Sequence, residues 1–157
     1  MLDFALAALL AAAAPANPQV DYPGFRKLAV DVEEYRRGRL LDWKGFAAAA
    51  AEPDVLILDA RSADAFRRGH IDGAVNLPFT DFTAESLAAV IGDPNRPILI
   101  YCNNNFSNDE PPVQVKAVRL ALNIQTFINL VGYGYANVRE LNEVVDFNDP
   151  KVSWVKG

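Results

Sequence analysis

The sequence predicts an α/β layered fold with a central, mainly parallel sheet. Short apolar runs bounded by turn residues recur along the chain, as expected for buried strands, and segments with helical spacing separate them. The predicted strands cover residues 39–41 (a short edge strand), 55–59, 74–77, 97–101 and, as the last strand, 137–141. The length of 157 residues suits one domain, and a hydrophobic content of 51% excludes a disordered chain. The net charge of −5 argues against nucleic-acid binding.

Capping residues and apolar spacing predict the helices between these strands. Candidate N-caps precede three of the helices, and they are Asp42, Ser62 and Thr83. Further helices are predicted at residues 28–37, 112–122 and 124–131, with Asn123 as an interruption between the last two. The prolines in residues 17–25 predict an extended leader before the first helix.

Residues 1–16 have the features of a secretory signal peptide. Residues 4–14 form a continuous apolar run that is too short to span a bilayer, and Ala14-Pro15-Ala16 supplies the small residues of a cleavage site. No Lys or Arg precedes the run, which is atypical, and an ordinary N-terminal helix is the alternative. We expect a periplasmic or secreted protein with no stable membrane anchor after cleavage. Without a signal peptide, the protein would be cytoplasmic.

Cys102 is the only cysteine and the first candidate for chemistry. It follows the predicted strand 97–101, at the sheet edge where open α/β folds bind their ligands. A lone thiol forms neither an internal disulfide nor a multi-cysteine metal site. The alternative is that Cys102 is a small buried apolar residue. We expect no metal and no organic cofactor, because the sequence holds neither a cluster of ligands nor a phosphate-binding glycine motif.

Two motifs resemble signatures of the rhodanese-like domain. Asp59-Ala60-Arg61 followed by residues 66–78 resembles its N-terminal signature, and residues 134–141 are similar to its C-terminal signature. The usual double glycine after the second motif is replaced by Asn142-Glu143. Tyr101-Cys102 looks like the family's active-site cysteine and the residue before it. The resemblance implies a three-layer sandwich in a single domain over residues 39–157, with an N-terminal extension at 17–38 and an enlarged segment after the cysteine.

The resemblance implies sulfurtransfer at Cys102. Family members accept a sulfane sulfur on this cysteine as a persulfide and pass it to a nucleophile, so we expect a small sulfur donor and a thiol or cyanide-like acceptor. Loop N–H groups and a following helix N-terminus are expected to lower the pKa of the thiol. One alternative is a catalytically inactive module that binds a protein partner through residues 103–112. A phosphatase, the other alternative, needs an arginine near the end of the loop.

The segment after Cys102 is predicted to bind the substrate through hydrogen bonds. Its candidate residues are Asn103, Asn104, Asn105, Phe106 and Ser107, and the alternative is a polar turn that bonds only to its own backbone. Residues 103–110 carry no basic side chain, so dianionic thiosulfate is predicted to be a poor donor. The competing interpretation is that Arg61 or Lys116 supplies the missing charge.

Three further residues have alternative roles in the first signature. Asp59 and Arg61 are predicted to form a structural pair, with anion binding by Arg61 as the alternative. His70 is predicted to bond to the backbone near Gly69 and Gly73, with a role as a base for Cys102 as the alternative. The core is predicted to include the side chains of Phe66, Ile71, Val75 and Leu77.

Overall fold

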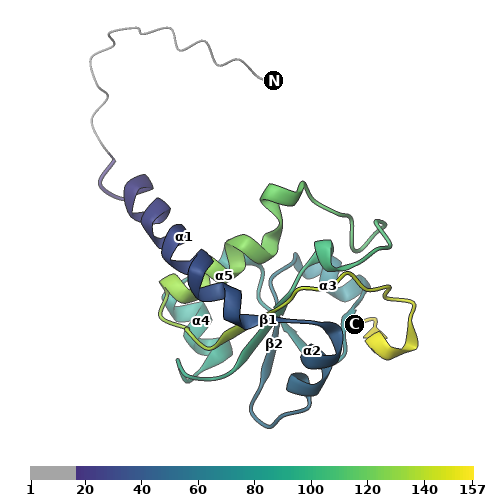
Figure 1. Cartoon of the computed structure of the whole chain (residues 1–157). Coiled ribbons are helices and arrows are strands. Elements are labelled where there is room, and N and C mark those ends of the chain that lie inside the picture. Colours follow the sequence, from purple (N-terminus) through teal and green to yellow (C-terminus); the bar gives the residue numbers. More distant parts are fainter. Residues whose placement is uncertain (1–16) are drawn as a thin grey trace, which may run out of the picture.

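The computed structural model describes residues 17–157 and confirms the α/β architecture (Figure 1). A five-stranded sheet has the order β1-β6-β5-β2-β4, and every neighbouring pair in it is parallel. Its strands are β1 (Leu40–Leu41), β2 (Leu56–Asp59), β4 (Ala74–Asn76), β5 (Ile98–Tyr101) and β6 (Val138–Leu141). The signal peptide expected at residues 1–16 lies outside the described residues. No helix in the described part is long and apolar enough to cross a membrane.

A second, two-stranded sheet was not predicted from the sequence. It pairs β3 (His70–Ile71) antiparallel with β7 (Trp154–Val155). The prediction that residues 137–141 form the last strand is therefore wrong. Strands of two residues carry too little alternation to give a sequence pattern.

In residues 17–157, five α-helices surround the sheet (Figure 1). They are α1 (Tyr22–Arg36), α2 (Trp43–Ala50), α3 (Ala63–Arg68), α4 (Ala84–Ile91) and α5 (Leu122–Gly132). The three predicted N-caps are confirmed, because each side chain accepts a hydrogen bond from a backbone N–H of the first turn. The predicted caps therefore fix where α2, α3 and α4 begin.

Helix α1 begins earlier than predicted. Its first residue is Tyr22, so the prediction of an extended leader through residue 25 is wrong for the last four residues. Asp21 caps the helix through the N–H of Gly24, and Pro23 lies in the first turn, where the missing N–H costs nothing. The helix packs on α5, where Leu28 lies so close to Gly132 that an added Cβ would be 3.0 Å from it.

The predicted helix over residues 112–122 is also wrong. Residues 113–117 are irregular, a short 3-10 helix follows at Val118–Leu120, and α5 begins at Leu122 with Asn123 in its first turn. Val118 and Leu120 are 82% and 64% exposed, so this segment buries no continuous helical face. Side chains of Asn103 and Asn104 instead bond to its backbone.

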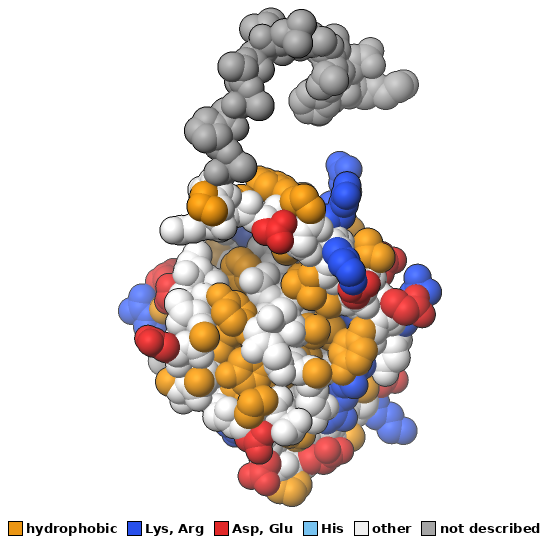
Figure 2. Space-filling model, turned by 90° about the vertical axis from the view of Figure 1, so that its left-hand side faces the viewer, with side chains coloured by type: hydrophobic (Ala, Val, Ile, Leu, Met, Phe, Trp, Pro, Cys, Tyr) orange, Lys and Arg blue, Asp and Glu red, His pale blue; other side chains and the backbone are white. Residues whose placement is uncertain are grey.

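The two faces of the sheet bury separate hydrophobic clusters. Alternate residues of β5 point to opposite sides, with Ile98 and Ile100 toward α1, α4 and α5, and Leu99 and Tyr101 toward α2. Viewed from the side of α1, α4 and α5, the surface carries hydrophobic and uncharged polar groups, with charged side chains mostly at its margins (Figure 2). Strand β5 is thus covered on both faces and delivers Cys102 to a fixed position.

The predicted core residues are only partly confirmed. Ile71 and Leu77 are buried, whereas Val75 is 41% exposed and Phe66 is half-buried. Val75 lies on the edge strand β4, and Phe66 stacks on His70 with the ring centroids 3.7 Å apart. The prediction that Phe66 and Val75 belong to the core is therefore wrong.

Candidate functional site

Cys102 lies directly after β5, between the ends of β2 and β6. Its side chain is buried, and it begins a short 3-10 helix over Asn103–Asn105. The backbone N–H of Asn104 donates to Cys102 Sγ over 3.4 Å. The sequence prediction that the thiol stands where a buried strand meets a loop is confirmed.

The N-terminus of α5 also faces the sulfur. No side chain caps this helix, and the backbone N–H groups of Leu122 and Asn123 interact with Cys102. Burial nevertheless raises the pKa of the Cys102 thiol, and the negative charge of Glu140 raises it further, while these N–H groups and that of Asn104 lower it. Burial prevails, so the expected lowering of the thiol pKa is not found.

A network of asparagine side chains holds the cysteine. Asn105 Nδ2 donates to the carbonyl oxygens of Leu141 and Glu143, which leaves Asn105 Oδ1 facing Cys102. That oxygen accepts from the Cys102 N–H over 2.9 Å and from Asn123 Nδ2 over 3.0 Å. Asn123 Oδ1 therefore points at the sulfur and accepts a hydrogen bond from it. The side-chain orientations of both asparagines follow from the two fixed carbonyl groups.

A small cavity of about 190 Å³ contains Cys102. Its other lining residues are Arg61, Ser62, Ala65, Asn103, Lys116 and Leu122. Two cationic side chains thus border the cavity, although the loop directly after Cys102 carries none. The prediction that thiosulfate is a poor donor assumed a pocket without Lys or Arg, and that assumption is wrong.

Asn104 places Lys116 at the cavity. Asn104 Nδ2 donates to the Lys116 carbonyl over 2.8 Å, and Asn104 Oδ1 accepts from the Lys116 N–H over 3.0 Å. Asn103 Nδ2 donates to the carbonyl of Gln114 in the same segment, whereas the buried Asn103 Oδ1 accepts no hydrogen bond from the described residues. The two asparagines fasten the irregular segment 113–117 over the sulfur.

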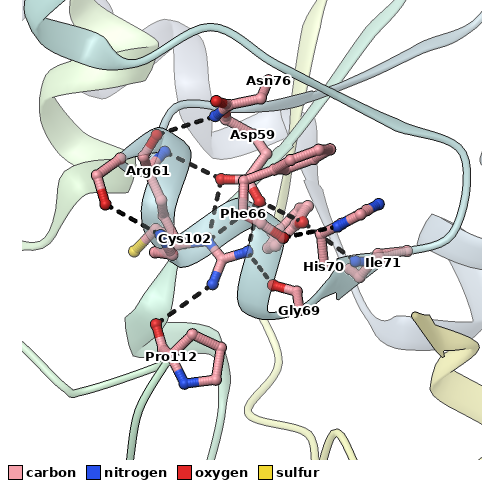
Figure 3. Close-up of polar contacts among 12 residues, drawn as sticks. Asp59, Arg61, Phe66, Gly69, His70, Ile71, Asn76, Cys102 and Pro112 are labelled. Atoms are coloured by element: carbon pink, nitrogen blue, oxygen red, sulfur yellow. Dashed lines mark hydrogen bonds and ion pairs between the residues drawn. The ribbon is translucent and has the colours of Figure 1, made fainter. Parts of the chain in front are cut away.

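The buried Arg61 guanidinium is anchored on three sides (Figure 3). It pairs with both carboxylate oxygens of Asp59, with Nη2 to Oδ2 at 2.6 Å, and it donates to the carbonyls of Gly69 and Pro112. Tyr101 Oη also donates to Asp59, and burial holds the pKa of Tyr101 well above its ordinary value. The predicted structural pair of Asp59 and Arg61 is confirmed. The contact to Pro112 is long, 3.4 Å, so Nη1 is the least constrained part of the group.

His70 has a structural environment. Its Nδ1 is 2.8 Å from the Phe66 carbonyl, its ring stacks on Phe66, and it points away from Cys102 (Figure 3). The prediction of a backbone hydrogen bond is confirmed, although the partner is Phe66 and not the neighbourhood of Gly73. The arrangement gives no support to a base role toward the thiol.

The predicted substrate-binding residues separate into three groups. Asn103 lines the cavity of Cys102, whereas Asn104 and Asn105 line a larger cavity. Phe106 and Ser107 line neither: Phe106 is buried against Tyr101 and Trp154, and Ser107 bonds to the Val145 carbonyl. Phe106 therefore anchors the enlarged segment in the core.

Sequence reasoning missed Asn123 and Leu122 as neighbours of Cys102. Asn123 was interpreted only as a helix interruption, and its polar side chain at the start of an apolar helical pattern was the available signal. Lys116 was placed on a predicted helix, although it was named as a source of charge. These residues lie 14–21 positions after Cys102, so only the path of the enlarged segment brings them to the sulfur.

Two of the three solved structures compared below, those with TM-scores of 0.55 and 0.50, show the same fold at low sequence identity. A thiosulfate sulfurtransferase from Pseudomonas aeruginosa has a TM-score of 0.55 and 19% identity, and the match covers 85% of this chain and 23% of that one. Wild-type EanB has a TM-score of 0.50 and 21% identity, with 74% and 26% covered. A rhodanese from E. coli, solved with anions, has a TM-score of 0.43 and 21% identity, with 66% and 99% covered.

Sequence comparison identifies the family. No curated protein shows significant sequence similarity to the chain. The family model described as "Rhodanese-like domain" matches residues 42–143, which run from the N-cap of α2 past the end of β6 and include β2, β4, β5 and β6 of the central sheet. The matched region includes Cys102 and both signatures, and the chain belongs to the rhodanese-like domain family.

Proposed function

We propose that the protein is a sulfurtransferase in which Cys102 carries the sulfur. The thiolate attacks the outer sulfur of a donor such as thiosulfate, the S–S bond of the donor breaks, and sulfite leaves with its electron pair. The resulting Cys102 persulfide then gives its outer sulfur to a nucleophile and returns to the thiolate. Atoms and charge balance in both steps without a metal or organic cofactor.

One observation carries this proposal: Cys102 shares a small cavity with two cations while backbone N–H groups surround its sulfur. Lys116 supplies positive charge for an anionic donor, and Arg61, whose charge is paired with Asp59, has its Nη1 as the least constrained hydrogen-bond donor. The N–H groups of Asn104, Leu122 and Asn123 stabilise negative charge on sulfur. The cavity of about 190 Å³ is smaller than the roughly 300–1,000 Å³ of most organic-ligand sites. This size favours a small inorganic donor.

A non-enzymatic binding module has one observation in its favour. Cys102 is 1% exposed, and burial raises the pKa of its thiol, so the reactive thiolate is a minor species at neutral pH. Sulfurtransfer then requires that the donor reach the sulfur through the cavity and that loading accelerate as pH rises. An inert thiol would favour the module, with residues 103–112 as its partner-binding segment.

Intact-mass measurement after donor exposure distinguishes the two functions. The protein is incubated with thiosulfate or an organic persulfide, freed of donor and weighed. We expect a gain of one sulfur atom at Cys102, its loss on addition of cyanide, and no gain in Cys102→Ser. A wild-type protein that gains no sulfur from either donor over a range of pH would contradict the proposal.

We also propose export of the chain, on the basis of the apolar run and the Ala14-Pro15-Ala16 sequence. The mature protein would then begin at Asn17. N-terminal sequencing of the protein from its native host tests this, and an intact Met1 on cytoplasmic protein would overturn it.

A further inference from the structure

A second cavity, larger than the one at Cys102, does not include Cys102 among its lining residues. It has a volume of about 580 Å³ and lies between α1, α5 and the segment that follows β6. Apolar side chains form most of its walls, including Val32, Ala121, Ile124, Phe127, Ile128 and Leu141. This volume is within the range of sites for small organic molecules.

Asn123 connects this cavity with the reactive sulfur. It lines the large cavity, and its Oδ1 accepts a hydrogen bond from Cys102 Sγ. Asn105, which also lines the cavity, holds the Asn123 amide by accepting from Nδ2 over 3.0 Å. Cys102 lines the smaller cavity. Its sulfur therefore borders the smaller cavity directly and contacts the larger cavity through the hydrogen bond to Asn123.

The two cavities differ in charge. Lys116 and Arg61 border the smaller one, where the charge of Arg61 is paired with Asp59 and that of Lys116 has no ion-pair partner among the described residues. Glu33, Glu140 and Glu143 border the larger one, and Arg36, the one cation among its described lining residues, is already bound to both carboxylate oxygens of Glu140. Glu33 lies 3.8 Å from Arg37, whereas Glu143 accepts a hydrogen bond from the Trp43 N–H and has no cationic partner among the described residues. Glu143 therefore leaves negative charge at the larger cavity, which disfavours acidic ligands.

We propose that the larger cavity binds the sulfur acceptor, and that the acceptor is an apolar organic thiol without a negative charge. This inference rests on the proposed sulfurtransfer at Cys102. The donor enters through the smaller cavity. The acceptor approaches the sulfur past Asn123, which lies between the larger cavity and Sγ. The sulfur of the acceptor thiol attacks the outer sulfur of the persulfide, the bond from that sulfur to Sγ breaks, and the proton of the acceptor passes to Sγ, which leaves as the thiol.

Separate measurement of the two half-reactions tests the assignment. Cys102 is loaded with thiosulfate, the donor is removed, and sulfur transfer is followed to cyanide, to benzyl mercaptan and to the para-carboxylate analogue of benzyl mercaptan. In wild-type protein we expect benzyl mercaptan to have a KM about tenfold below that of its carboxylate analogue. Cyanide is small and anionic, and it reaches the sulfur through the cationic cavity.

Two variants fill the larger cavity from opposite walls. Ile124→Trp acts from α5 and Ala29→Trp from α1, and both residues line the cavity. We expect each to raise the KM for benzyl mercaptan about tenfold, while sulfur loading and transfer to cyanide stay within twofold of wild type. Val75→Trp is the matched control, because Val75 is 41% exposed, Ile124 is 39% exposed, and Val75 lines neither cavity.

A charge reversal tests ligand selectivity at the same wall. Glu33 is exposed on α1, and Glu33→Lys should lower the KM for the carboxylate analogue about threefold without changing that for benzyl mercaptan. The outcomes separate the two proposals. If Cys102 gains sulfur but the KM values for both thiols are unchanged in Ile124→Trp, Ala29→Trp and Glu33→Lys, the acceptor site alone is overturned. A Cys102 that gains no sulfur overturns both.

Discussion

At the scale of single residues, two opposing effects act on the pKa of the Cys102 thiol. Three backbone N–H groups favour the thiolate, whereas burial and the Asn123 carbonyl oxygen favour the thiol. The sequence located this thiol at the end of a strand, because an apolar run followed by polar residues is a local signal. The direction of its pKa shift was not predictable, because it depends on cover by residues that lie 14–21 positions away.

The thiol should therefore react slowly at neutral pH. Burial raises the pKa of Cys102, so the fraction of thiolate should still be rising above about pH 8.5, the ordinary value for a free cysteine. We expect the rate of alkylation by iodoacetamide to increase with pH and to have an apparent pKa above that value. The same folded-state shift makes stability fall as pH rises from the unfolded pKa toward the folded one. An alkylation rate whose pH profile has its midpoint below about 8 would contradict the dominance of burial.

Breaking the buried ion pair of Arg61 and Asp59 from one side should be strongly destabilising. Arg61 and Asp59 are 3% and 0% exposed, so Arg61→Met leaves a buried carboxylate without its counter-charge. We expect a loss of about 3–5 kcal/mol in the free energy of unfolding, measured by urea denaturation. Arg67→Met is the control, because the Arg67 side chain is 70% exposed beside Asp64 and should change stability by less than about 1 kcal/mol. A similar small loss in Arg61→Met would mean that the pair is dispensable.

At the scale of elements, the sequence predictions were most accurate for buried strands and for helices that begin with a capping residue. Strands β2 and β5, and helices α2, α3 and α4, have the predicted order and nearly the predicted limits. The segment 113–121 was misassigned because its valines and leucine mimic a helical pattern, whereas its backbone is held by asparagines about a dozen residues earlier. Such non-local bonds leave no periodicity to detect.

The Asn104 side chain should keep the segment 113–121 in one conformation. Asn104→Ala removes its two hydrogen bonds to the Lys116 backbone, each worth about 0.5–1.5 kcal/mol. We expect faster hydrogen exchange at the Lys116 amide and a higher KM for thiosulfate, because Lys116 is no longer held at the cavity. Asn108→Ala is the control in the same connection, since Asn108 bonds to Asp146 and Phe147. Unchanged exchange at Lys116 in Asn104→Ala would contradict this role.

At the scale of the whole molecule, the two signatures were sufficient to predict the family and the sheet. The location of the two cavities was not predictable, because each combines residues from distant parts of the chain. Helix α1 shows why: it lies outside residues 42–143, yet it packs on α5 and forms one wall of the larger cavity. Its bidentate ion pair from Arg36 to Glu140 ties it to the central sheet.

The overall charge and the local charge should act on thiosulfate in opposite directions. The chain carries a net charge of −5, which repels a dianion, while Lys116 attracts it at the cavity, where the charge of Arg61 is paired with Asp59. Because Lys116 is close to the bound donor, we expect the KM for thiosulfate to rise as salt is added.

Lys116→Gln removes this exposed cation, and its KM should be higher at low salt. The general repulsion then dominates, so added salt should lower the KM of this variant. Steady-state kinetics from about 0.02 to 0.5 M salt, with Lys44→Gln as a control on the exposed surface of α2, measure both slopes. A wild-type KM that falls with salt would show that Lys116 does not face the donor.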